Sequence, residues 1–382
     1  MDIPIAIDGI RGEIVRDTLI IRSEKPLKVL SSAPFNGGFI EARTIINHQV
    51  PKEFHHAKID EYLEGVINGL HLPKPVVCLM TAVNIRDNIS VSSEVMDGLI
   101  VTALVTSGLS YPATAGDRVA EEGAGTVNII VLVDGNLTDS CMVNALMTAI
   151  EAKCAALREL DVRSRYSNNV ATGTTSDAIV IACTRVGEAI HYAGSATILG
   201  MLIGKNVKAA VKESSLKFLG ERTLMRRLEE RGITLDDLVS TAMALYTPSE
   251  GDEDVNGDVD VNVNGNGNGN VSKILKDGLI EAMNDINVAS FVMGAIRLQE
   301  DGEYGLIPNL PRNSFLKDPI TLIADESIGL ALANYIAGTW GVYNFLRYER
   351  VKPGIMAKAG PFLDDMIGGL VAGVFSKVMS RR

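Results

Sequence analysis

Residues 249–270 limit the fold of this chain more than any other segment. The run holds six acidic residues, several Asn-Gly pairs, no Lys or Arg, and only four apolar residues, all of them Val. It has too little apolar surface to offset the conformational entropy that is lost on ordering, so it is typical of a flexible tether. We therefore predict two folded domains, residues 1–247 and 271–382, joined by an acidic linker over residues 248–270.

The linker contains a fragment that matches half of a calcium-binding loop. Asp252, Asp254, Asn256 and Gly257 have the spacing of the first six positions of such a loop. The twelfth position requires a bidentate Glu but is occupied by Val263, and no amphipathic helix pattern leads into or out of the loop. The interpretation as a solvated linker is therefore favoured over a calcium site.

Composition narrows the classes of protein that fit. The formal net charge is −11, and the acids of the linker account for more than half of it, which argues against nucleic-acid binding. Cys78, Cys141, Cys154 and Cys183 lie among apolar residues without C-x-x-C spacing, so we expect buried, reduced thiols. The first residues lack the basic start and apolar core of a signal peptide, and we expect a cytoplasmic protein.

One uncharged segment, residues 327–345, is long enough to cross a bilayer. It is only mildly apolar, since it includes Asn334, Thr339 and Asn344, and charged residues flank it closely. A buried helix of a bundle explains it more simply than a membrane span does, so we expect no membrane insertion.

The first domain combines strand and helix patterns. Its strand-like runs are rich in β-branched residues and cover residues 18–21, 27–30, 40–46, 76–79, 99–107, 125–134 and 178–183. Helix patterns cover residues 59–70 and 139–160, and Thr138 is the expected N-cap of the second helix. This order predicts an α+β domain of layered sheet and helices.

The second of these helices carries polar side chains in apolar surroundings. Asn144, Thr148 and Glu151 are spaced i, i+4 and i+7, so they share one face. A carboxylate on a mostly covered helix is either paired or used in a site. The alternative is that Glu151 marks the point where the helix reaches solvent.

A polar loop, residues 166–177, precedes the strand over residues 178–183. Its hydroxyl and amide side chains surround Gly173, and Asp177 lies directly before the strand. Such a loop allows close backbone approach and offers hydrogen-bond donors and one candidate base. The alternative is a hydrogen-bonded turn in which Ser and Thr cap the strand.

Seven motifs occur in one order in the first domain: Ser31-Ser-Ala-Pro-Phe-Asn-Gly-Gly-Phe39, Thr81-Ala-Val, Val105-Thr-Ser-Gly-Leu-Ser110, Gly125-Thr-Val-Asn-Ile-Ile, Asn144-Ala-Leu-Met-Thr-Ala-Ile-Glu-Ala-Lys153, Ala171-Thr-Gly-Thr-Thr-Ser-Asp177 and Tyr192-Ala-Gly. In this order they resemble the adenosylcobinamide amidohydrolase family over nearly the whole domain. The family pattern A-T-G-T-G-T-D is met except that Thr175 and Ser176 stand in its fifth and sixth positions, which replaces one expected glycine.

The resemblance implies hydrolysis of the amide that joins aminopropanol to the corrin ring of adenosylcobinamide, with release of adenosylcobyric acid. Such a reaction needs a base, a positioned water or hydroxyl, and donors to the tetrahedral oxyanion. The predicted catalytic residues are Asp177 or Glu151 as the base, Thr172 and Thr174 as hydroxyls near the scissile carbonyl, and Asn144 and Asn168 as donors.

The second domain is predicted to be an all-α helical bundle, with helix patterns over residues 271–286 and 288–297. Two acidic pairs, at residues 325–326 and 364–365, lie within apolar helix patterns. Buried acids are costly unless a partner compensates them, and a hard cation such as Mg²⁺ is a suitable partner.

Basic residues near these acids allow two interpretations. With Arg347 and Lys352 to contact phosphate oxygens, the pattern indicates metal-assisted hydrolysis of a phosphate ester. The alternative is a set of structural salt bridges from the acids to Arg347, Arg350 and Lys352.

Four motifs of the second domain also occur in a known order: Asp318-Pro, Asp325-Glu-Ser-Ile-Gly329, Lys352-Pro-Gly354 and Asp364-Asp-Met-Ile-Gly-Gly369. They resemble the phosphatidylglycerophosphatase A family, and most closely its archaeal branch that acts as α-ribazole-phosphate phosphatase. Glu349 stands where the bacterial branch commonly has Asp. The predicted metal ligands are Asp325, Glu326, Glu349, Asp364 and Asp365, with Arg347 and Lys352 as substrate-binding residues.

Together the two domains resemble bifunctional cobamide-biosynthesis proteins of the CbiS type. The implied partners are small molecules, namely adenosylcobinamide and either α-ribazole 5′-phosphate or adenosylcobalamin 5′-phosphate. Two other functions stay open: the second domain as a membrane-associated phosphatidylglycerophosphate phosphatase, and the first as a non-catalytic corrinoid-binding module. The sequence does not determine the oligomeric state.

Overall fold

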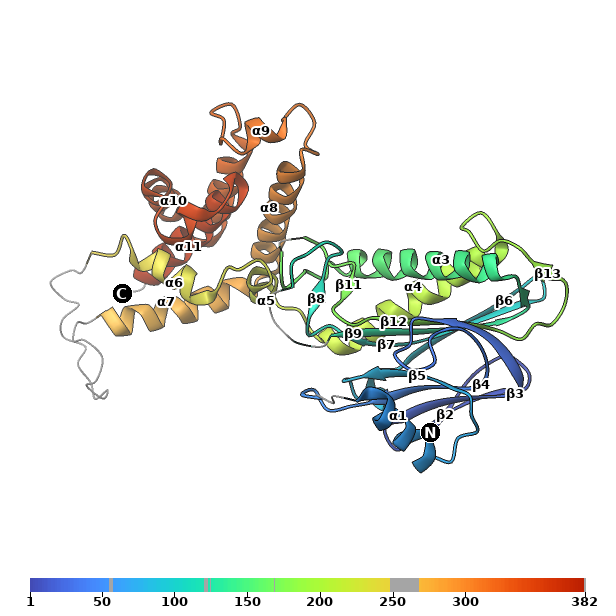
Figure 1. Cartoon of the computed structure of the whole chain (residues 1–382). Coiled ribbons are helices and arrows are strands. Elements are labelled where there is room, and N and C mark those ends of the chain that lie inside the picture. Colours follow the sequence, from blue (N-terminus) through green and yellow to red (C-terminus); the bar gives the residue numbers. More distant parts are fainter. Residues whose placement is uncertain (55–57, 120–122, 124, 168, 248–267, 381–382) are drawn as a thin grey trace. The chain divides into compact units, whose positions relative to one another are not determined.

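The computed structural model describes residues 1–54, 58–119, 123, 125–167, 169–247 and 268–380. The chain forms two compact units, Met1–Glu221 and Arg222–Arg382 (Figure 1). The calcium-loop fragment and all but the last three residues of the predicted linker lie outside the described residues.

The boundary between the units differs from the predicted one near residue 247. Helices α5 (Leu224–Glu229) and α6 (Leu235–Met243) precede the acidic run, yet their apolar side chains belong to the core of the second unit. In that unit the Tyr348 hydroxyl donates to Ala242 O at 2.6 Å, and Ile355 N donates to Thr241 Oγ1 at 3.1 Å. The residues that these two short helices contact lie beyond the acidic run. Their position in the sequence, before that run, therefore does not indicate the domain to which they belong.

A curled, mixed sheet of nine strands forms the larger part of the first unit as described, together with two small two-stranded sheets. The strands are β1 (Asp2–Ile3), β2 (Ile10–Val15), β3 (Thr18–Ser31), β4 (Gly38–Gln49), β5 (Val76–Thr81), β6 (Ser90–Met96), β7 (Leu99–Gly108), β8 (Pro112–Ala113), β9 (Thr126–Asp134), β10 (Asn136–Leu137), β11 (Gly173–Thr174), β12 (Ala178–Cys183) and β13 (Ala189–Ile190). The helices are α1 (Ile59–Gly69), α2 (Ile85–Asn88), α3 (Asp139–Glu159) and α4 (Ile198–Leu219).

Strand β3 belongs to two leaves of this sheet. The strand order is β1-β2-β3-β12-β9-β7-β6, and β4 pairs with both β3 and β5. The register of β3 against β4 shifts between Arg22 and Leu27, an irregularity that bends a strand. Residues 18–23 pair with β2, whereas residues 28–31 pair with β12. The two strands predicted over residues 18–21 and 27–30 are therefore halves of one strand.

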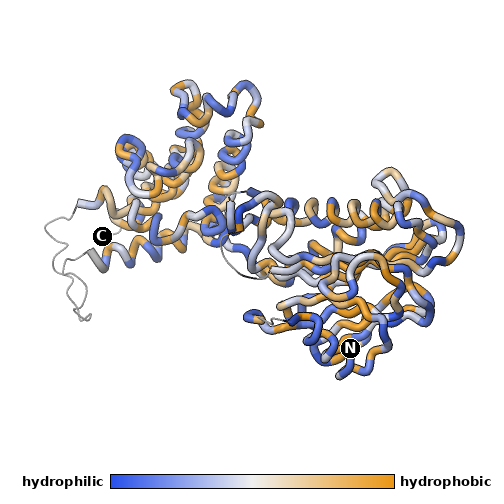
Figure 2. The backbone as a smooth tube through the Cα atoms, in the orientation of Figure 1, coloured by the Kyte–Doolittle hydropathy of each residue, from blue (hydrophilic) through white to orange (hydrophobic). Residues whose placement is uncertain are grey.

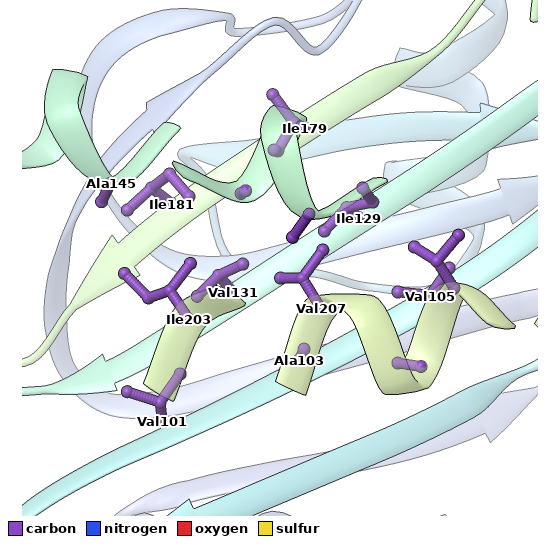
Figure 3. Packing of buried hydrophobic residues seen from close by; sticks show 14 of the residues in the cluster. Val101, Ala103, Val105, Ile129, Val131, Ala145, Ile179, Ile181, Ile203 and Val207 are labelled. Carbon is purple, nitrogen blue, oxygen red and sulfur yellow. The ribbon is translucent and has the colours of Figure 1, made fainter. Parts of the chain in front are cut away.

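The central leaf, formed by β12, β9, β7 and β6, is covered on both faces. Helices α3 and α4 lie on one face, and strands β2, β4 and β5 lie on the other (Figure 1). Val131 of β9 lies beside Ile203 of α4 (Figure 3), and Ile129 belongs to the same core cluster, while Ile130 belongs to the core between the leaves. Strands buried on both faces have nearly continuous apolar sequences, as Figure 2 shows for the central strands.

Several of the motifs quoted above meet at one edge of the sheet. Gly108 at the end of β7 pairs with the first residue of β9, and Ala178 at the start of β12 pairs with Asn128. The Asn128 side chain reaches β5, where Nδ2 donates to Met80 O at 2.7 Å. A Cβ on Gly108 would lie only 2.7 Å from Val83, so glycine allows this close approach. The sheet therefore gathers distant motifs at the edge where β12 begins.

Local predictions in the first unit are largely confirmed. The Thr138 hydroxyl caps α3 by accepting a hydrogen bond from Cys141 N at 3.2 Å. Cys78, Cys141 and Cys183 are buried free thiols, whereas Cys154 is half-buried. These features depend on near neighbours in the sequence and on apolar surroundings, which the sequence shows directly.

The second unit is helical. Besides α5 and α6 its helices are α7 (Asn268–Met283), α8 (Ile286–Tyr304), α9 (Arg312–Phe315), α10 (Ala324–Val351), the 3₁₀ helix η1 (Gly354–Lys358) and α11 (Pro361–Met379). Helix α11 is buried at most positions and packs against α6, α7, α8 and α10.

We predicted that the uncharged segment over residues 327–345 forms one buried helix of the bundle, and the structure shows that this is wrong. Non-helical torsions at Ala337 and Gly338 break α10 into two halves. The halves fold against each other, and a Cβ on Gly329 would lie 2.6 Å from the Phe345 ring. Trp340 is 73% exposed. The positive φ of 57° at Gly338 permits the break, which apolar content alone does not reveal.

Among the described residues, α3 is the one helix that could cross a membrane by length and composition. The bent pair α7–α8 would make a second if it were one span. Helix α3 packs on the central leaf, and 44% of its apolar window is buried. The segment over residues 327–345 is not among these helices.

Candidate functional site

The first candidate site is centred on the Asp177 carboxylate, at the sheet edge described above. Its Oδ1 accepts hydrogen bonds from Val127 N at 2.9 Å and from Thr174 Oγ1 at 2.5 Å. Its Oδ2 lies 2.5 Å from Lys153 Nζ, which extends from α3. The Lys153 and Asp177 side chains are 12% and 17% exposed, so the ion pair is mostly shielded from water.

Glycine at position 173 makes room for this ion pair. Gly173 and Thr174 form β11, which pairs with β8. A Cβ on Gly173 would clash with Asp177 Oδ2 and would lie 2.8 Å from Lys153 Nζ. The ammonium and the carboxylate therefore meet in space that any other residue would fill.

Thr174 differs from the other hydroxyl residues of its loop. Thr175 Oγ1 and Ser176 Oγ each donate to a backbone carbonyl oxygen at 2.8 Å, and Thr172 Oγ1 accepts from a backbone N–H at 2.9 Å. These three hydroxyls fasten the loop, as the turn interpretation predicts. Among the hydroxyls of residues 172–176, that of Thr174 donates its proton to a carboxylate, which leaves it suited to chemistry.

The polar face of α3 has a different role. Asn144 Oδ1 accepts from Ala193 N at 2.9 Å, and Thr148 Oγ1 donates to Ala193 O at 2.8 Å. Both polar atoms of this backbone unit are thus held by α3. Glu151, which shares the face, is exposed. The predicted donor Asn144 therefore positions a loop instead of contacting the Asp177 site.

Glu151 and Asp177 lie on opposite flanks of α3. Glu151 and Lys153 are two residues apart, so their side chains point about 200° apart around the helix axis. Because Lys153 contacts Asp177, Glu151 faces away from it. The two candidate bases are not part of one site, and Asn168 lies outside the described residues.

Lys153 is a site residue that the sequence prediction omits. It is the first basic residue of α3 and follows an uncharged stretch over residues 140–150. A half-buried ammonium needs a carboxylate partner, and Glu151 offers an apparent one nearby. Residues at i and i+2 do not face each other on a helix, however, so the partner had to come from another element.

The second candidate site is a buried carboxylate cluster in the second unit. Asp325 and Glu326 of α10 and Asp365 of α11 offer oxygen atoms within 4.8 Å of one another. Asp325 and Asp365 are 1% and 2% exposed. Glu349, from the second half of α10, hydrogen-bonds to Asp365. The structure therefore brings together four of the five predicted metal ligands.

The surroundings of these carboxyl groups favour their protonated forms. Burial and a hydrogen bond with Glu326 raise the pKa of Asp325 to about 7. Burial and a hydrogen bond with Glu349 raise the pKa of Asp365 to about 10. So many carboxylates cannot all ionise in one buried space unless a positive charge joins them.

Three oxygen atoms of the cluster remain without a partner. Glu326 Oε2, Glu349 Oε2 and Asp365 Oδ1 are buried and have no hydrogen-bond partner within the described ranges. Buried polar oxygens are normally bonded, and carboxylate oxygens are the ligands that Mg²⁺ prefers. The donor set therefore fits a hard divalent cation.

Asp364, the fifth predicted ligand, pairs with Lys352 instead. Lys352 Nζ lies 2.7 Å from Asp364 Oδ2, 3.1 Å from Glu349 and 3.2 Å from Asp318. Burial lowers the pKa of Lys352, but its hydrogen bonds with Asp364 and Glu349 outweigh this and hold the pKa above its ordinary value. Asp364 therefore forms the salt bridge of the alternative interpretation. Glu349 contacts both Lys352 and Asp365 of the carboxylate cluster.

Arg347 does not join Lys352. It is exposed and donates to Asn344 Oδ1 at 3.3 Å. Arg347 and Glu349 are two residues apart on α10, so they point about 200° apart. Arg347 therefore lies on the face of α10 that is turned away from the carboxylates. Asp318, which is outside the predicted set of site residues, contacts Lys352 instead.

Two glycines set the distance between the acidic helices. Gly329 follows Asp325 by one helical turn, and Gly369 follows Asp365 by one turn. A Cβ on Gly369 would clash with Gly329 O, and a Cβ on Gly329 would lie 2.5 Å from Asp365 O. Each motif therefore couples a predicted metal ligand to the contact that holds the two helices together.

We expect Gly369→Ala to lower the affinity of the second unit for Mg²⁺ or Mn²⁺ at least about tenfold. The added methyl group must push α10 and α11 apart, at a cost of about 1–3 kcal/mol in the free energy of unfolding. Titration calorimetry and thermal unfolding measure the two effects. Gly294→Ala is the matched control, because a Cβ there meets no atom within 4 Å. Unchanged metal affinity in Gly369→Ala would contradict this account.

The raised carboxyl pKa values predict that the metal-free second unit loses stability as pH rises. An acid whose pKa in the folded state exceeds its unfolded value of about 4 stabilises the fold below that value, and this contribution is lost as pH approaches the folded-state pKa. For Asp325 the window runs from about pH 4 to about pH 7. Thermal unfolding in a chelator measures this loss. Added Mg²⁺ should restore stability at pH 7 and release protons, and a flat profile in both conditions would refute the explanation.

Comparison with known proteins identifies the family. Residues 6–223, more than half of the chain, match the family model described as adenosylcobinamide amidohydrolase (CbiZ). This chain belongs to the adenosylcobinamide amidohydrolase family. The family match ends two residues into the second unit, which agrees with a boundary after Glu221.

Several individual proteins are similar to this chain, and one of them carries the description of the family. An uncharacterized protein of Methanocaldococcus jannaschii, MJ1613, is 33% identical over 238 residues, which cover 56% of this chain and 90% of the relative. The adenosylcobinamide amidohydrolase of Methanosarcina mazei is 29% identical over 213 residues, covering 53% and 96%. Another uncharacterized M. jannaschii protein, MJ1330, is 43% identical over 112 residues, covering 28% and 85%.

Similar solved structures include the low temperature requirement C protein of Listeria monocytogenes, with a TM-score of 0.33 and 23% identity over 41% of this chain and 93% of that chain. Protein ypjQ of Bacillus subtilis has a TM-score of 0.32 and 20% identity, covering 41% and 91%.

Proposed function

We propose that the first unit hydrolyses the amide between aminopropanol and the corrin ring of adenosylcobinamide at Asp177, Thr174 and Lys153. Family membership supports the substrate. The observation that carries the site is the contact of one carboxylate with a hydroxyl and an ammonium, each at 2.5 Å. A base, a hydroxyl and a cation are the groups that amide hydrolysis requires.

In the proposed reaction Asp177 accepts the proton of Thr174 while Thr174 Oγ1 attacks the carbonyl carbon. The negative charge that develops on the carbonyl oxygen is stabilised by the Lys153 ammonium, which has three N–H donors and directs one to Asp177. Asp177 then returns the proton to the departing nitrogen, the C–N bond breaks, and aminopropanol leaves. Water hydrolyses the ester on Thr174, which releases adenosylcobyric acid and regenerates the hydroxyl.

For the second unit we propose metal-dependent hydrolysis of a phosphate monoester, with α-ribazole 5′-phosphate or adenosylcobalamin 5′-phosphate as substrate. The unbonded oxygens of Glu326, Glu349 and Asp365 support a bound divalent cation. When bound, Mg²⁺ would activate water and neutralise charge on the phosphoryl group. Lys352, at the edge of the cluster, supplies a positive charge for a phosphate oxygen.

The proposal is tested by incubating the full chain separately with adenosylcobinamide and with α-ribazole phosphate, each with and without Mg²⁺. We expect release of aminopropanol in the first reaction and Mg²⁺-dependent release of phosphate in the second. Binding of cobinamide without release of aminopropanol would make the first unit a corrinoid-binding module. Release of phosphate from phosphatidylglycerophosphate, but not from α-ribazole phosphate, would make the second unit a lipid phosphatase.

A further inference from the structure

The first unit exposes a continuous apolar surface that the reaction centre does not use. Its members, which we call the outer apolar face, are Val143, Met147 and Ile150 of α3, Ile198 and Met201 of α4, and Tyr192. Their exposed fractions range from 40% to 73%. Residues 140–150 and 192–204, which supply all six, contain no charged residue. A patch of this kind commonly marks a binding surface.

Contacts between α3 and α4 show that these residues lie together. Early in the helices, a Cβ on Gly204 would lie 3.9 Å from Thr148. Later, Lys208 and Lys212 bond to Glu159 at 3.0 and 2.8 Å. The two helices therefore run parallel, with their N-terminal halves side by side. Because Val143, Met147 and Ile150 recur at i, i+4 and i+7, they form one stripe of α3 next to the exposed residues of α4.

The loop that carries Tyr192 is held rigidly. Asn144 and Thr148 bond both polar atoms of Ala193. A Cβ on Gly200 would clash with Gly194 O, so the loop also packs tightly on the start of α4. Two side chains of α3 thus fix a backbone whose neighbouring aromatic ring is 73% exposed. An aromatic ring that is fixed in position and exposed to solvent is well placed to pack against a ligand.

The outer apolar face leads to the reaction centre. Cys154 follows Ile150 by one turn, and its Sγ donates to Thr172 O at 3.3 Å. Thr172 is two residues before Thr174, and Lys153 lies beside Cys154 on the flank that contacts Asp177. A ligand lying along the stripe of α3 therefore extends to the carboxylate and the hydroxyl.

We propose that the outer apolar face is the platform on which the corrin macrocycle of the substrate lies, with the aminopropanol amide directed to Asp177. This assignment rests on the proposed amidohydrolase function. The macrocycle is a large ring with broad faces, and such a ligand needs an extended, uncharged surface with an aromatic side chain at its border. The proposal also explains why α3 is long and apolar enough to cross a membrane, although it packs on a sheet. Its outward face is apolar as well as its buried face.

The test compares Met147→Glu with Leu216→Glu. Leu216 is 50% exposed on the distal half of α4 and is the matched control. Binding of adenosylcobinamide is measured by equilibrium dialysis in an Asp177→Asn background, where turnover does not interfere, and KM and kcat are measured with Asp177 present. We expect Met147→Glu to raise Kd and KM at least about tenfold with little change in kcat, and Leu216→Glu to change neither.

Tyr192→Ser provides a second variant. It removes only an exposed ring, and we expect it to raise the Kd for adenosylcobinamide as well. Unchanged Kd in both variants of a protein that hydrolyses cobinamide would overturn the platform and leave the proposed function intact. A wild-type protein that neither binds nor hydrolyses cobinamide would overturn both. If Met147→Glu instead dissociated an oligomer or abolished sedimentation with phospholipid vesicles while Kd stayed constant, the face would serve another partner and the proposal would fail.

Discussion

Replacing Asp177 by Asn is expected to lower kcat for adenosylcobinamide hydrolysis by about 10³-fold, the scale of a lost general base. Asn cannot accept the Thr174 proton, although it retains the shape of the side chain and one acceptor oxygen. Release of aminopropanol under saturating substrate measures the effect. Glu151→Gln, which lies on the other flank of α3, should change kcat by less than about threefold, because exposed substitutions away from a site have small effects.

Two further variants separate chemistry from folding at this site. Thr174→Ser should retain substantial activity because it keeps a hydroxyl, whereas Thr174→Val should lose about as much as Asp177→Asn, since groups that act as a unit are not additive. Thermal unfolding of each variant controls for structural damage. Normal turnover in folded Asp177→Asn would remove Asp177 from the mechanism, and a strong loss in Glu151→Gln would transfer the role to the other flank.

Replacing Asp365 by Asn is expected to abolish Mg²⁺-dependent release of phosphate, with a loss of at least about 10³-fold, because a ligand and its charge are removed together. Without metal the same variant should be as stable as the wild type or more stable. The reason is that burial raises the pKa of Asp365 to about 10, so folding without metal at neutral pH must protonate this carboxyl group, and Asn does not carry that cost. Phosphate release and thermal unfolding in a chelator measure the two effects.

The control for this variant is Asp301→Asn, an exposed acid on α8, which should leave phosphate release and metal binding unchanged. The amidohydrolase activity of Asp365→Asn serves as an internal reference, because Asp365 lies in the other unit. Full phosphatase activity in Asp365→Asn, or equal loss of stability with and without chelator, would show that the cluster has a structural role.

Much of the fold follows from local patterns. The Thr138 cap depends on residues three positions apart, and the strand over residues 178–183 is apolar because both of its faces are covered. Neither feature requires knowledge of distant partners. The break at Gly338 and the packing of α5 and α6 do require it, because they depend on which segment of the chain lies opposite.

The candidate sites were predictable to different degrees for the same reason. Acids embedded in apolar helices are conspicuous, so Asp325 and Asp365 could be selected from the sequence. The pairing of Asp364 with Lys352 depends on the path of the chain after α10, so it could not be predicted from the sequence. The spacing on a helix, in contrast, could be used at the sequence level: Arg347 and Glu349 are two positions apart, and residues at i and i+2 do not face each other.

Because α5 and α6 belong to the second unit, the acidic run does not lie between the two units. Helix α6 ends at Met243 and α7 begins at Asn268, and both belong to the second unit. The run is therefore an insertion within one domain, and a protease that cuts there would nick the proposed phosphatase without freeing the amidohydrolase. The two units join instead between Glu221 and Arg222, with a connection of almost no length. The acidic run instead lengthens the connection between two helices of the second unit, where each doubling of the loop length adds only a small cost in closure entropy.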